Sequence, residues 1–231
     1  MTKDKITEFY NKRKKVYNFI LTPGSLYQLV FDLIGQKEKV LDVGCANGNF
    51  SQELKKKGAA VYGIEVSPEM AKNSAKVLDE VIVGNIETIK LPWRKAHFDT
   101  ILLMDILEHL FSPKDVLFNL KPFLKEKGKV IVTIPNVANW EVRKELLFGR
   151  FDSEKTAILE EGHIRFFTYD TAKKMFGQAG YKIKSFNLVI NYPLLLLKIH
   201  NRFGFLKIDV FLKKYCAKLF AYQFIFELVK K

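Results

Sequence analysis

The sequence predicts an α/β fold with a mostly parallel sheet and helices on both faces. One observation is that short apolar runs alternate with helical stretches from about residue 38 to residue 190. The other is that the first run ends in a glycine turn that opens a helix, in Val40–Phe50 (VLDVGCANGNF). Such an alternation winds into a parallel sheet with right-handed crossovers, and ligands bind beyond the carboxyl ends of its strands.

Glycines and helix-capping residues set the expected elements. Lys39–Val43 is short, apolar and followed by glycine, as a buried strand is, and Gly58 ends the helix after it. Ser67 and Pro68 suit the N-cap and first position of the next helix. We expect strands at 39–43, 60–66, 80–83, 98–104, 129–134, 182–189 and 222–229. We expect helices at 49–57, 67–77, 113–124 and 171–179.

The length of 231 residues predicts one domain with additions. We expect an N-terminal helical cap at 1–35 and a single domain at 36–231. Residues 136–168 form an unusually long connection, which is typical of a functional lid. Residues 192–220 are apolar and basic and predict a helical insert, interrupted at Gly204.

Composition excludes several classes of protein. Apolar residues make up 48% of the chain and charged residues 27%, which suits a globular core and excludes a disordered chain. Two cysteines cannot form a disulfide scaffold, and the charged N-terminus lacks the apolar core of a secretory signal. The longest apolar run, Leu194–Leu197, is far too short to span a membrane. We therefore expect a cytoplasmic protein, with a peripheral membrane location as the alternative.

The net charge of +13 is concentrated in the flanks. Residues 1–40 hold eight basic and four acidic side chains, and residues 182–231 hold ten and two, whereas the middle is nearly neutral. Such flanks attract nucleic acid, anionic lipid or phosphorylated substrates, or simply keep the surface solvated. Charge alone leaves these alternatives open.

The glycine loop excludes two common nucleotide sites. It has glycines only at 44 and 48, so it fits neither the dinucleotide fingerprint G-x-G-x-x-G nor a P-loop. The carboxylate of Asp42, just before the loop, would repel a pyrophosphate. It suits a ligand with an ammonium and a sulfonium group and no phosphate, such as S-adenosylmethionine.

Several motifs together resemble one family across residues 38–190. The loop resembles D-x-G-x-G-x-G, the first motif of class I S-adenosylmethionine-dependent methyltransferases, with Ala46 replacing the middle glycine. We expect this alanine to be tolerated if its φ is negative. Asp105–Leu110 (DILEHL) resembles the D-x-L-E-H-[LIV] signature, and Ile134–Asn136 (IPN) also matches. The resemblance implies a Rossmann-like, seven-stranded methyltransferase sheet with an antiparallel last strand, and S-adenosylmethionine as the cofactor.

A further segment narrows the resemblance. Gly162–Thr168 (GHIRFFT) resembles the H-x-R-F-F-T segment of type 11, 12 and 23 methyltransferases, which are often encoded beside glycan-assembly enzymes. In that family, the segment packs beneath the active site.

The resemblance also implies the residues that hold the cofactor. Glu65 would accept hydrogen bonds from the ribose hydroxyls, and Asn85 would accept one from the adenine amino group. Tyr10 and Tyr17, on the N-terminal helix, would close over the cofactor or simply pack. The full set of expected cofactor residues is Asp42, Gly44, Cys45, Ala46, Asn47, Gly48, Phe50, Glu65, Val66, Asn85, Ile86, Met104, Asp105, His109, Tyr10 and Tyr17.

Three residues are candidates for catalysis. Methyl transfer mainly requires an aligned acceptor, and a general base helps when that acceptor is a hydroxyl. His109, at the mouth of the fourth strand, is the first candidate for the base. The alternative is that it packs against the cofactor or forms a hydrogen bond with a loop carbonyl. His163 and Arg165 would contact the substrate, or anchor the lid.

A metal site is an alternative at the same place. Asp105, Glu108 and His109 have the spacing of one helix face, and His163 could join them as a fourth ligand. Small-RNA 2′-O-methyltransferases use a related arrangement around a divalent ion.

Three functions remain open. The first is methylation, expected on oxygen, of a small acceptor such as a glycan, lipid-linked or isoprenoid intermediate. Residues 192–220 would then lie on an anionic membrane surface, or form a cap or dimer contact. The second is metal-assisted RNA 2′-O-methylation, which the charge favours but no RNA-binding motif supports. The third is a non-catalytic S-adenosylmethionine-binding module.

Overall fold

A computed structural model describes residues 21–152, 156–190 and 216–231. They form one seven-stranded sheet, in the order β3-β2-β1-β4-β5-β7-β6. The strands are β1 (Lys39–Val43), β2 (Ala60–Glu65), β3 (Glu80–Val83), β4 (Phe98–Met104), β5 (Leu124–Pro135), β6 (Tyr181–Ile190) and β7 (Ala221–Lys230).

The sheet is parallel from β3 to β5, and β7 runs antiparallel to both of its neighbours, β5 and β6. The predicted methyltransferase-type sheet, with an antiparallel last strand, is therefore confirmed. The strand order reverses direction between β1 and β4, and a crevice opens at such a switch point, beyond the carboxyl ends of the strands.

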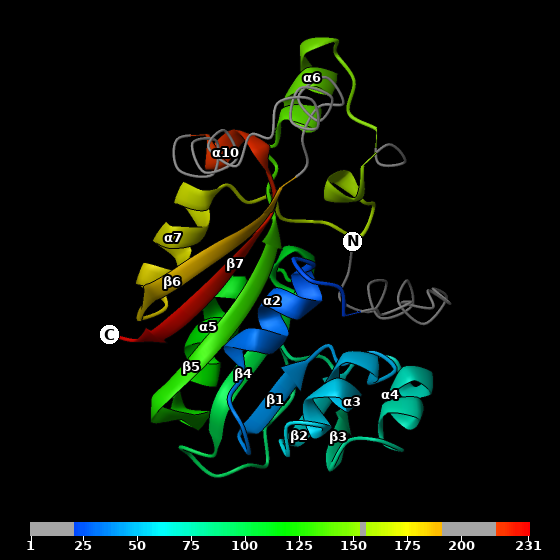
Figure 1. Cartoon of the computed structure of the whole chain (residues 1–231), viewed down its shortest axis with the longest axis vertical. Coiled ribbons are helices and arrows are strands. Elements are labelled where there is room, and N and C mark those ends of the chain that lie inside the picture. Colours follow the sequence, from blue (N-terminus) through cyan, green and yellow to red (C-terminus); the bar gives the residue numbers. More distant parts are fainter. Residues whose placement is uncertain (1–20, 153–155, 191–215) are drawn as a thin grey trace.

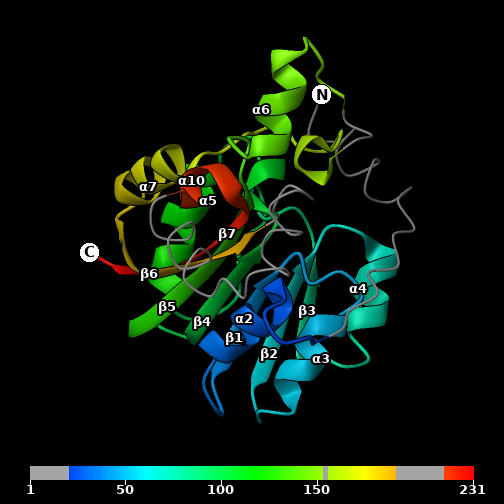
Figure 2. The ribbon, with the colours of Figure 1, turned by 45° about the horizontal axis from the view of Figure 1, so that its top comes forward.

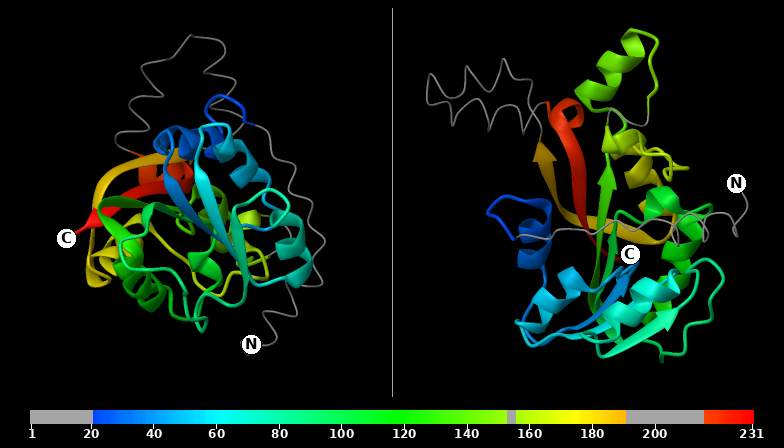
Figure 3. Two further views of the ribbon diagram at one scale, coloured as in Figure 1. Left: turned by 90° about the horizontal axis from the view of Figure 1, so that it is seen from below. Right: turned by 90° about the vertical axis from the view of Figure 1, so that its right-hand side faces the viewer.

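Helices cover both faces of the sheet, as expected (Figure 1). On one face, α5 (Pro113–Leu120) and α7 (Tyr169–Gln178) pack Leu117 and Phe176 into the larger core. On the other face, α2 (Leu26–Leu33) lies against β6 and β7 and α3 (Asn49–Lys55) against β2, and they place Val30 and Leu54 in the second core. The other α-helices within the described ranges are α4 (Pro68–Ser74), α6 (Trp140–Leu147) and α10 (Ala217–Phe220). The right-hand view of Figure 3 shows helices on either side of the sheet.

Local capping fixes where these helices begin. The Ser67 side chain accepts a hydrogen bond from the Met70 N–H at the start of α4. Thr168 does the same for α7, in a reciprocal capping box with Thr171. Helix α5 ends at Leu120, four residues before the predicted end, because Pro122 follows in a short 3₁₀ turn. Strand β5 takes up the residues from Leu124.

The long connection after β5 has more structure than a bare loop. It contains α6 and a 3₁₀ turn at Ala157–Leu159, which buries Ile158 and Leu159 against Val142 of α6. In Figures 1 and 2, α6 stands out from the top of the molecule, beyond the carboxyl ends of the strands. The side chain of Asn136 ties this region to β7, because it donates to the carbonyl of Ala221.

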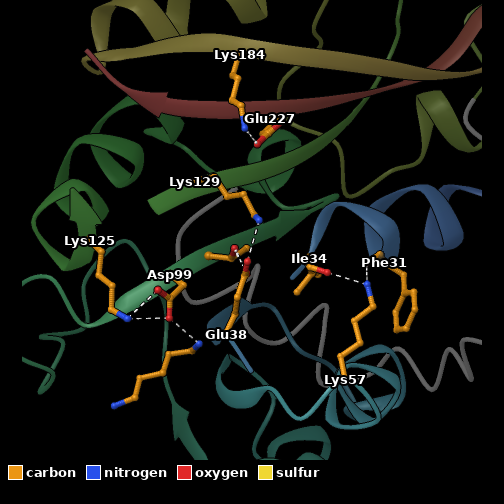
Figure 4. Close-up of polar contacts among 11 residues, drawn as sticks. Phe31, Ile34, Glu38, Lys57, Asp99, Lys125, Lys129, Lys184 and Glu227 are labelled. Carbon is orange, nitrogen blue, oxygen red and sulfur yellow. Dashed lines mark hydrogen bonds and ion pairs between the residues drawn. The ribbon is translucent and has the colours of Figure 1, made fainter. Parts of the chain in front are cut away.

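The amino end of the sheet is held together by ion pairs (Figure 4). Glu38 accepts a hydrogen bond from Lys129 Nζ at 3.0 Å, and Asp99 accepts one from Lys125 Nζ at 2.7 Å. Lys57 Nζ donates to the last carbonyl groups of α2, those of Phe31 and Ile34. Glu38 and Asp99 are thus each paired with a lysine at this end of the sheet.

Two predictions concern residues outside the described part. The N-terminal cap at 1–35 is described only from residue 21, where α2 packs on the sheet, and the insert at 192–220 only from residue 216. None of the helices in the described ranges has both the length and the apolar character that a bilayer span requires.

Candidate functional site

A cavity of about 400 Å³ opens at the carboxyl ends of β1, β2 and β4. It begins at the glycine loop and extends to residues that follow β4, to the 3₁₀ turn after α6, and to the first residues of β7. The predicted site residues that line it are Asp42, Gly44, Cys45, Ala46, Asn47, Phe50, Glu65, Val66, Asn85, Ile86, Met104, Asp105, His109 and His163. The cavity therefore brings together predicted site residues that are up to 121 positions apart, from Asp42 to His163.

The glycines of the loop serve different purposes. Gly44 has φ +78°, and a Cβ atom there would collide with the Ile106 side chain. Gly48 has φ +80°, and its Cβ would come within 2.8 Å of Val77 and 2.9 Å of Leu78. Gly48 does not line the cavity, so its requirement comes from the packing of α3 on the segment after α4, and not from contact with a cofactor.

Ala46 does not meet the condition under which an alanine would fit the loop without strain. Its φ is +47°, in the left-handed region that costs an L-residue about 1–2 kcal/mol. The loop holds this conformation because the Ala46 N–H donates to Glu65 Oε2 at 2.9 Å. A glycine, which the motif D-x-G-x-G-x-G has at this position, would adopt the same positive φ without strain.

Glu65 anchors the loop and faces the cavity at the end of β2. One carboxylate oxygen accepts the Ala46 N–H and the other accepts the Ser67 N–H, both at 2.9 Å. Burial raises its pKa, and these backbone hydrogen bonds work against the shift. The carboxylate also lines the cavity, so its position is compatible with acceptance of ribose hydroxyls.

Asp42 is a buried acid at the end of β1. Its Oδ2 accepts a hydrogen bond from Ser51 Oγ, at 2.6 Å. Burial raises its pKa to about 6, the Ser51 hydrogen bond lowers it, and the charge of Glu65 raises it further. A cation beside Asp42 would offset this cost, and the sulfonium or ammonium of S-adenosylmethionine would supply one.

The adenine side of the site is less complete. Asn85 follows β3 and lines the cavity, but its Oδ1 already accepts the Glu87 N–H at 2.9 Å. One lone pair of that oxygen remains for an amino group.

The backbone turns sharply where β4 ends. Asp105 has φ +53°, and a network of side chains stabilises this conformation. Asp105 Oδ1 accepts from Thr133 Oγ of β5 at 2.6 Å and from Gln223 Nε2 of β7. Two strands, β5 and β7, thus hold the Asp105 carboxylate, and the residues after the turn line the cavity.

Glu108 is the least hydrated acid of the site, at 1% exposed. Within the described ranges, neither of its carboxylate oxygens has a hydrogen-bond partner. Burial raises its pKa well above the usual value, and the nearby charge of Asp105 adds to the shift. A buried polar group without a partner is rare and costly, so it marks a site that a proton or a ligand completes.

Two histidines converge on this acid. His109 Nδ1 faces the Gly162 carbonyl at 2.8 Å, and His163 Nδ1 faces the Ile158 carbonyl at 2.9 Å. Carbonyl oxygens only accept, so each Nδ1 carries the hydrogen and each Nε2 of the neutral ring carries a lone pair. The two ring centroids are 4.7 Å apart.

Glu108, His109 and His163 each offer one ligand atom within 4.8 Å of the other two. Two imidazole nitrogens and one carboxylate oxygen form a donor set that suits first-row divalent ions, and backbone carbonyls orient both rings as they do at known metal sites. Asp105, the fourth candidate ligand from the sequence, is engaged by Thr133 and Gln223 and is not part of this group. The arrangement fits a divalent cation or a shared proton.

Two further expectations are revised or lie outside the described part. Arg165 does not line the cavity, and its guanidinium donates to the Phe111 carbonyl at 2.6 Å. This contact supports the anchoring role of the segment and not a role in catalysis. Tyr10 and Tyr17 lie outside the described residues.

The structure adds residues that sequence reasoning did not identify. Tyr27 of α2 lines the cavity and packs against Phe50, in the place expected for an N-terminal aromatic side chain. Tyr222, Gln223 and Glu160 line the opposite end. No motif marks them, because β7 reaches the site only through its insertion between β5 and β6.

Comparison with solved structures identifies the fold. A Thermotoga maritima protein, described as an S-adenosylmethionine-dependent methyltransferase and possible histamine N-methyltransferase, aligns with a TM-score of 0.61 and 20% identity. The alignment covers 89% of this chain and 87% of that one. The [4+2]-cyclase SpnF aligns with a TM-score of 0.60 and 18% identity, over 90% of this chain and 81% of that one. Identities this low show a shared fold and leave the reaction open.

Curated relatives match in sequence over shorter stretches. The mitochondrial ubiquinone biosynthesis O-methyltransferase of Schizosaccharomyces pombe is 35% identical over 106 residues, which cover 42% of this chain and 37% of that protein. The ubiquinone biosynthesis O-methyltransferase of Coxiella burnetii is 31% identical over 121 residues, 51% of this chain and 52% of that protein. The matched region thus spans about half or less of the length of these relatives.

A family model settles the membership. The model described as a methyltransferase domain matches residues 13–185, which is most of the chain and includes the glycine loop, Glu65 and the Glu108–His109 turn. The chain therefore belongs to this family, the class I S-adenosylmethionine-dependent methyltransferases.

Proposed function

We propose that the protein transfers a methyl group from S-adenosylmethionine to a hydroxyl oxygen of a small-molecule acceptor. The observation that carries the proposal is the continuity of the cavity. It runs from the loop that suits the cofactor to the cluster of Glu108, His109 and His163. The cavity would therefore hold both the positively charged cofactor and an acceptor whose hydroxyl loses a proton.

The chain's own residues would align the acceptor and take its proton. When bound, S-adenosylmethionine supplies an activated methyl group, and its C–S bond breaks as the new C–O bond forms. His109 Nε2 or His163 Nε2 would accept the hydroxyl proton, since Nδ1 of each ring is held by a carbonyl. Glu108 would stabilise the imidazolium that results.

In a second mode, which excludes the first, the same cluster would hold a divalent cation, and neither imidazole would then act as the base. Glu108, His109 and His163 would be its ligands, with Gly162 and Ile158 orienting the rings. Such an ion lowers the pKa of a hydroxyl bound to it and so favours O-methylation at neutral pH. The orphaned carboxylate of Glu108 supports this assignment.

The names of the relatives support an oxygen acceptor. Both curated proteins are described as ubiquinone biosynthesis O-methyltransferases. The Gly162–Thr168 resemblance adds glycan, lipid-linked and isoprenoid intermediates as acceptor classes. Among these, we favour a lipid-soluble acceptor, because Leu110, Pro135 and Ile158 form an apolar wall at the acceptor end of the cavity.

The alternatives drawn from residues 192–220 stay predictions. An anionic membrane contact of this insert, and an RNA contact of the basic flanks, both rest mainly on residues outside the described part. The non-catalytic alternative is disfavoured by the buried, unpartnered Glu108 beside two oriented imidazoles.

Calorimetry with S-adenosylmethionine and with NAD⁺ tests the cofactor first. We expect micromolar binding of S-adenosylmethionine and none of NAD⁺. Transfer of a labelled methyl group to a panel of hydroxylated aromatic and prenylated acceptors, with EDTA and then with Mn²⁺ or Zn²⁺, tests the reaction. His109→Ala should keep cofactor affinity and lose turnover. Full turnover in this variant would exclude His109 as the base, and methylation confined to nitrogen acceptors would overturn the proposal.

A further inference from the structure

The tip of α6 carries a group of exposed apolar side chains. Leu147 is 81% exposed and Phe148 is 63% exposed, and Leu146 and Phe151 are exposed beside them. They lie at the end of the helix and in the turn after it, where Gly149 has φ +68°. Apolar side chains clustered in this way on a soluble surface usually mark a contact with a partner or a membrane.

Cations and acids are distributed unequally on this arm, which we define as residues 140–152. Its three cations, Arg143, Lys144 and Arg150, are all exposed. Its three acids, Glu141, Glu145 and Asp152, are all partly buried. The arm is neutral in sequence, but its accessible surface is apolar and cationic, which is complementary to an anionic lipid surface.

The arm is continuous with the acceptor end of the cavity. Phe151 at the tip contacts the ring of Phe166, which belongs to the segment that returns to the sheet. Between these two, Ala157, Ile158 and Glu160 line the cavity. A membrane or partner that binds the tip of the arm would therefore lie close to the acceptor end of the cavity.

We propose that the tip of α6, Leu146–Phe148 with Phe151, inserts into the interface of an anionic lipid bilayer and places the cavity mouth over the membrane. The inference rests on the proposed function, because a lipid-soluble acceptor needs an enzyme that docks where the acceptor resides. The tip projects away from the sheet (Figures 1 and 2). A projecting apolar end flanked by cations suits a deformable lipid surface, whereas a protein partner would have to offer a matching pocket.

Vesicle co-sedimentation tests the inference directly. The probes are vesicles of phosphatidylcholine alone and of phosphatidylcholine with 30% phosphatidylglycerol. We expect binding to the anionic vesicles, and a loss of about tenfold or more in the double variant Leu147→Ser/Phe148→Ser. The matched control is Phe118→Ser, because Phe118 of α5 is 61% exposed and lies outside the arm.

A second pair of variants tests the charge. Lys144→Gln should weaken binding to anionic vesicles by about fivefold, which is the contribution of one lysine near such a surface. Lys114→Gln, an equivalent exposed lysine on α5, should not. Unchanged binding of both tip variants would overturn the inference. The inference would also be overturned if vesicle binding depended on salt concentration but not on the tip side chains. A dimer that forms through the tip, seen in sedimentation without vesicles, would overturn it as well.

Failure of this inference can be separated from failure of the proposed function. The tip variants should keep cofactor affinity and methylate a water-soluble hydroxyl acceptor at the rate of the parent chain. Methylation that persists without vesicle binding would remove the docking surface alone. Vesicle binding without methylation of any hydroxyl acceptor would remove the proposed function.

Discussion

The two ends of the sheet treat acidic side chains in opposite ways. At the amino end, Glu38 is paired with Lys129 and Asp99 with Lys125, and Glu227 is paired with Lys184. At the carboxyl end, Asp42, Glu65, Asp105 and Glu108 are packed into one cavity, and no ion pair joins them to a lysine or arginine of the described ranges. The chain is strongly basic, so cations were available for both ends.

The pKa directions follow this difference. Burial opposes ionisation of Asp99 and Glu227, but hydrogen bonds from Lys125 and Lys184 outweigh it and lower both pKa values. Burial raises the pKa of Asp42, Asp105 and Glu108 without such compensation. The amino end is therefore electrostatically complete, whereas the carboxyl end is completed by cations that a ligand brings.

The largest effect should come from Glu108→Gln, which removes the charge and keeps the shape. We expect turnover to fall by about 100-fold or more, because the histidine cluster loses its carboxylate, while cofactor affinity stays within about twofold. Glu227→Gln at the paired end is the control and should leave turnover unchanged. Equal turnover of the Glu108 variant and the parent would place catalysis elsewhere.

Glu65→Ala should weaken S-adenosylmethionine binding by about 30-fold in calorimetry. Hydrogen bonds to a charged group contribute about 1.5–3 kcal/mol, and the loop loses the acceptor for the Ala46 N–H. Glu65→Gln keeps one acceptor oxygen and should lose less affinity. An unchanged affinity of the alanine variant would refute the ribose assignment.

Stability should depend on pH with opposite sign at the two ends. Asp42 has a folded-state pKa of about 6, above its unfolded value, so without cofactor it lowers stability as pH rises from about 4 to 6. Asp99 has a lowered pKa, so its contribution is present above the unfolded value and is lost as pH falls through the folded value.

Urea denaturation at a series of pH values, without cofactor, measures both effects. Asp42→Asn should remove the decline between pH 4 and 6 and should weaken cofactor binding at neutral pH. Asp99→Asn should lower the free energy of unfolding at neutral pH. It should not change the decrease between pH 4 and 6 that Asp42 causes. A pH profile unaffected by Asp42→Asn would contradict the raised pKa.

Glu38→Gln should reduce the free energy of unfolding by about 1–3 kcal/mol, because the partly buried Lys129 loses its partner. Thr100 Oγ would still find an acceptor in the amide oxygen. Cofactor affinity should not change, and a large loss of affinity would show that the two ends are coupled.

The smallest effect concerns two alanines in left-handed conformation, one at each end of the sheet. Ala46 has φ +47° in the loop and Ala96 has φ +52° before β4. Substitution of either by glycine should raise the free energy of unfolding by about 0.5 kcal/mol, since relief of strain slightly exceeds the entropy that glycine loses. Only Ala46→Gly should also change cofactor affinity, which titration would detect.

The sheet was predictable because local signals agree with the fold. Lys39–Val43, Glu80–Val83 and Phe98–Met104 are strands with the predicted bounds, since each is apolar and bordered by polar or glycine residues. The positions of the glycine loop and of Glu65 were also predictable, because the loop directly follows β1 and Glu65 is the last residue of β2. Helix α6 was not predicted, because it is weakly apolar and buries only Val142.

Other parts of the site depend on contacts that no local pattern encodes. The left-handed turn at Asp105 depends on Thr133 and Gln223, residues that are 28 and 118 positions away. The sequence placed His109 and His163 at the site, but not the carbonyls of Gly162 and Ile158 that fix their tautomers. Tyr27 reaches the cavity because α2 packs beside α3, and its ring lies against that of Phe50.

The insertion of β7 between β5 and β6 has a consequence for biosynthesis. Gln223 and Tyr222 complete the cavity, and β7 also carries the hydrogen bonds that attach β6 to the rest of the sheet. During synthesis on the ribosome, β1 to β5 can form their parallel core before β7 is available to pair with β6. Binding of the cofactor to a nascent chain should therefore be incomplete until residues beyond 223 have left the exit tunnel, and the exposed edge of β5 would be a target for chaperones until then.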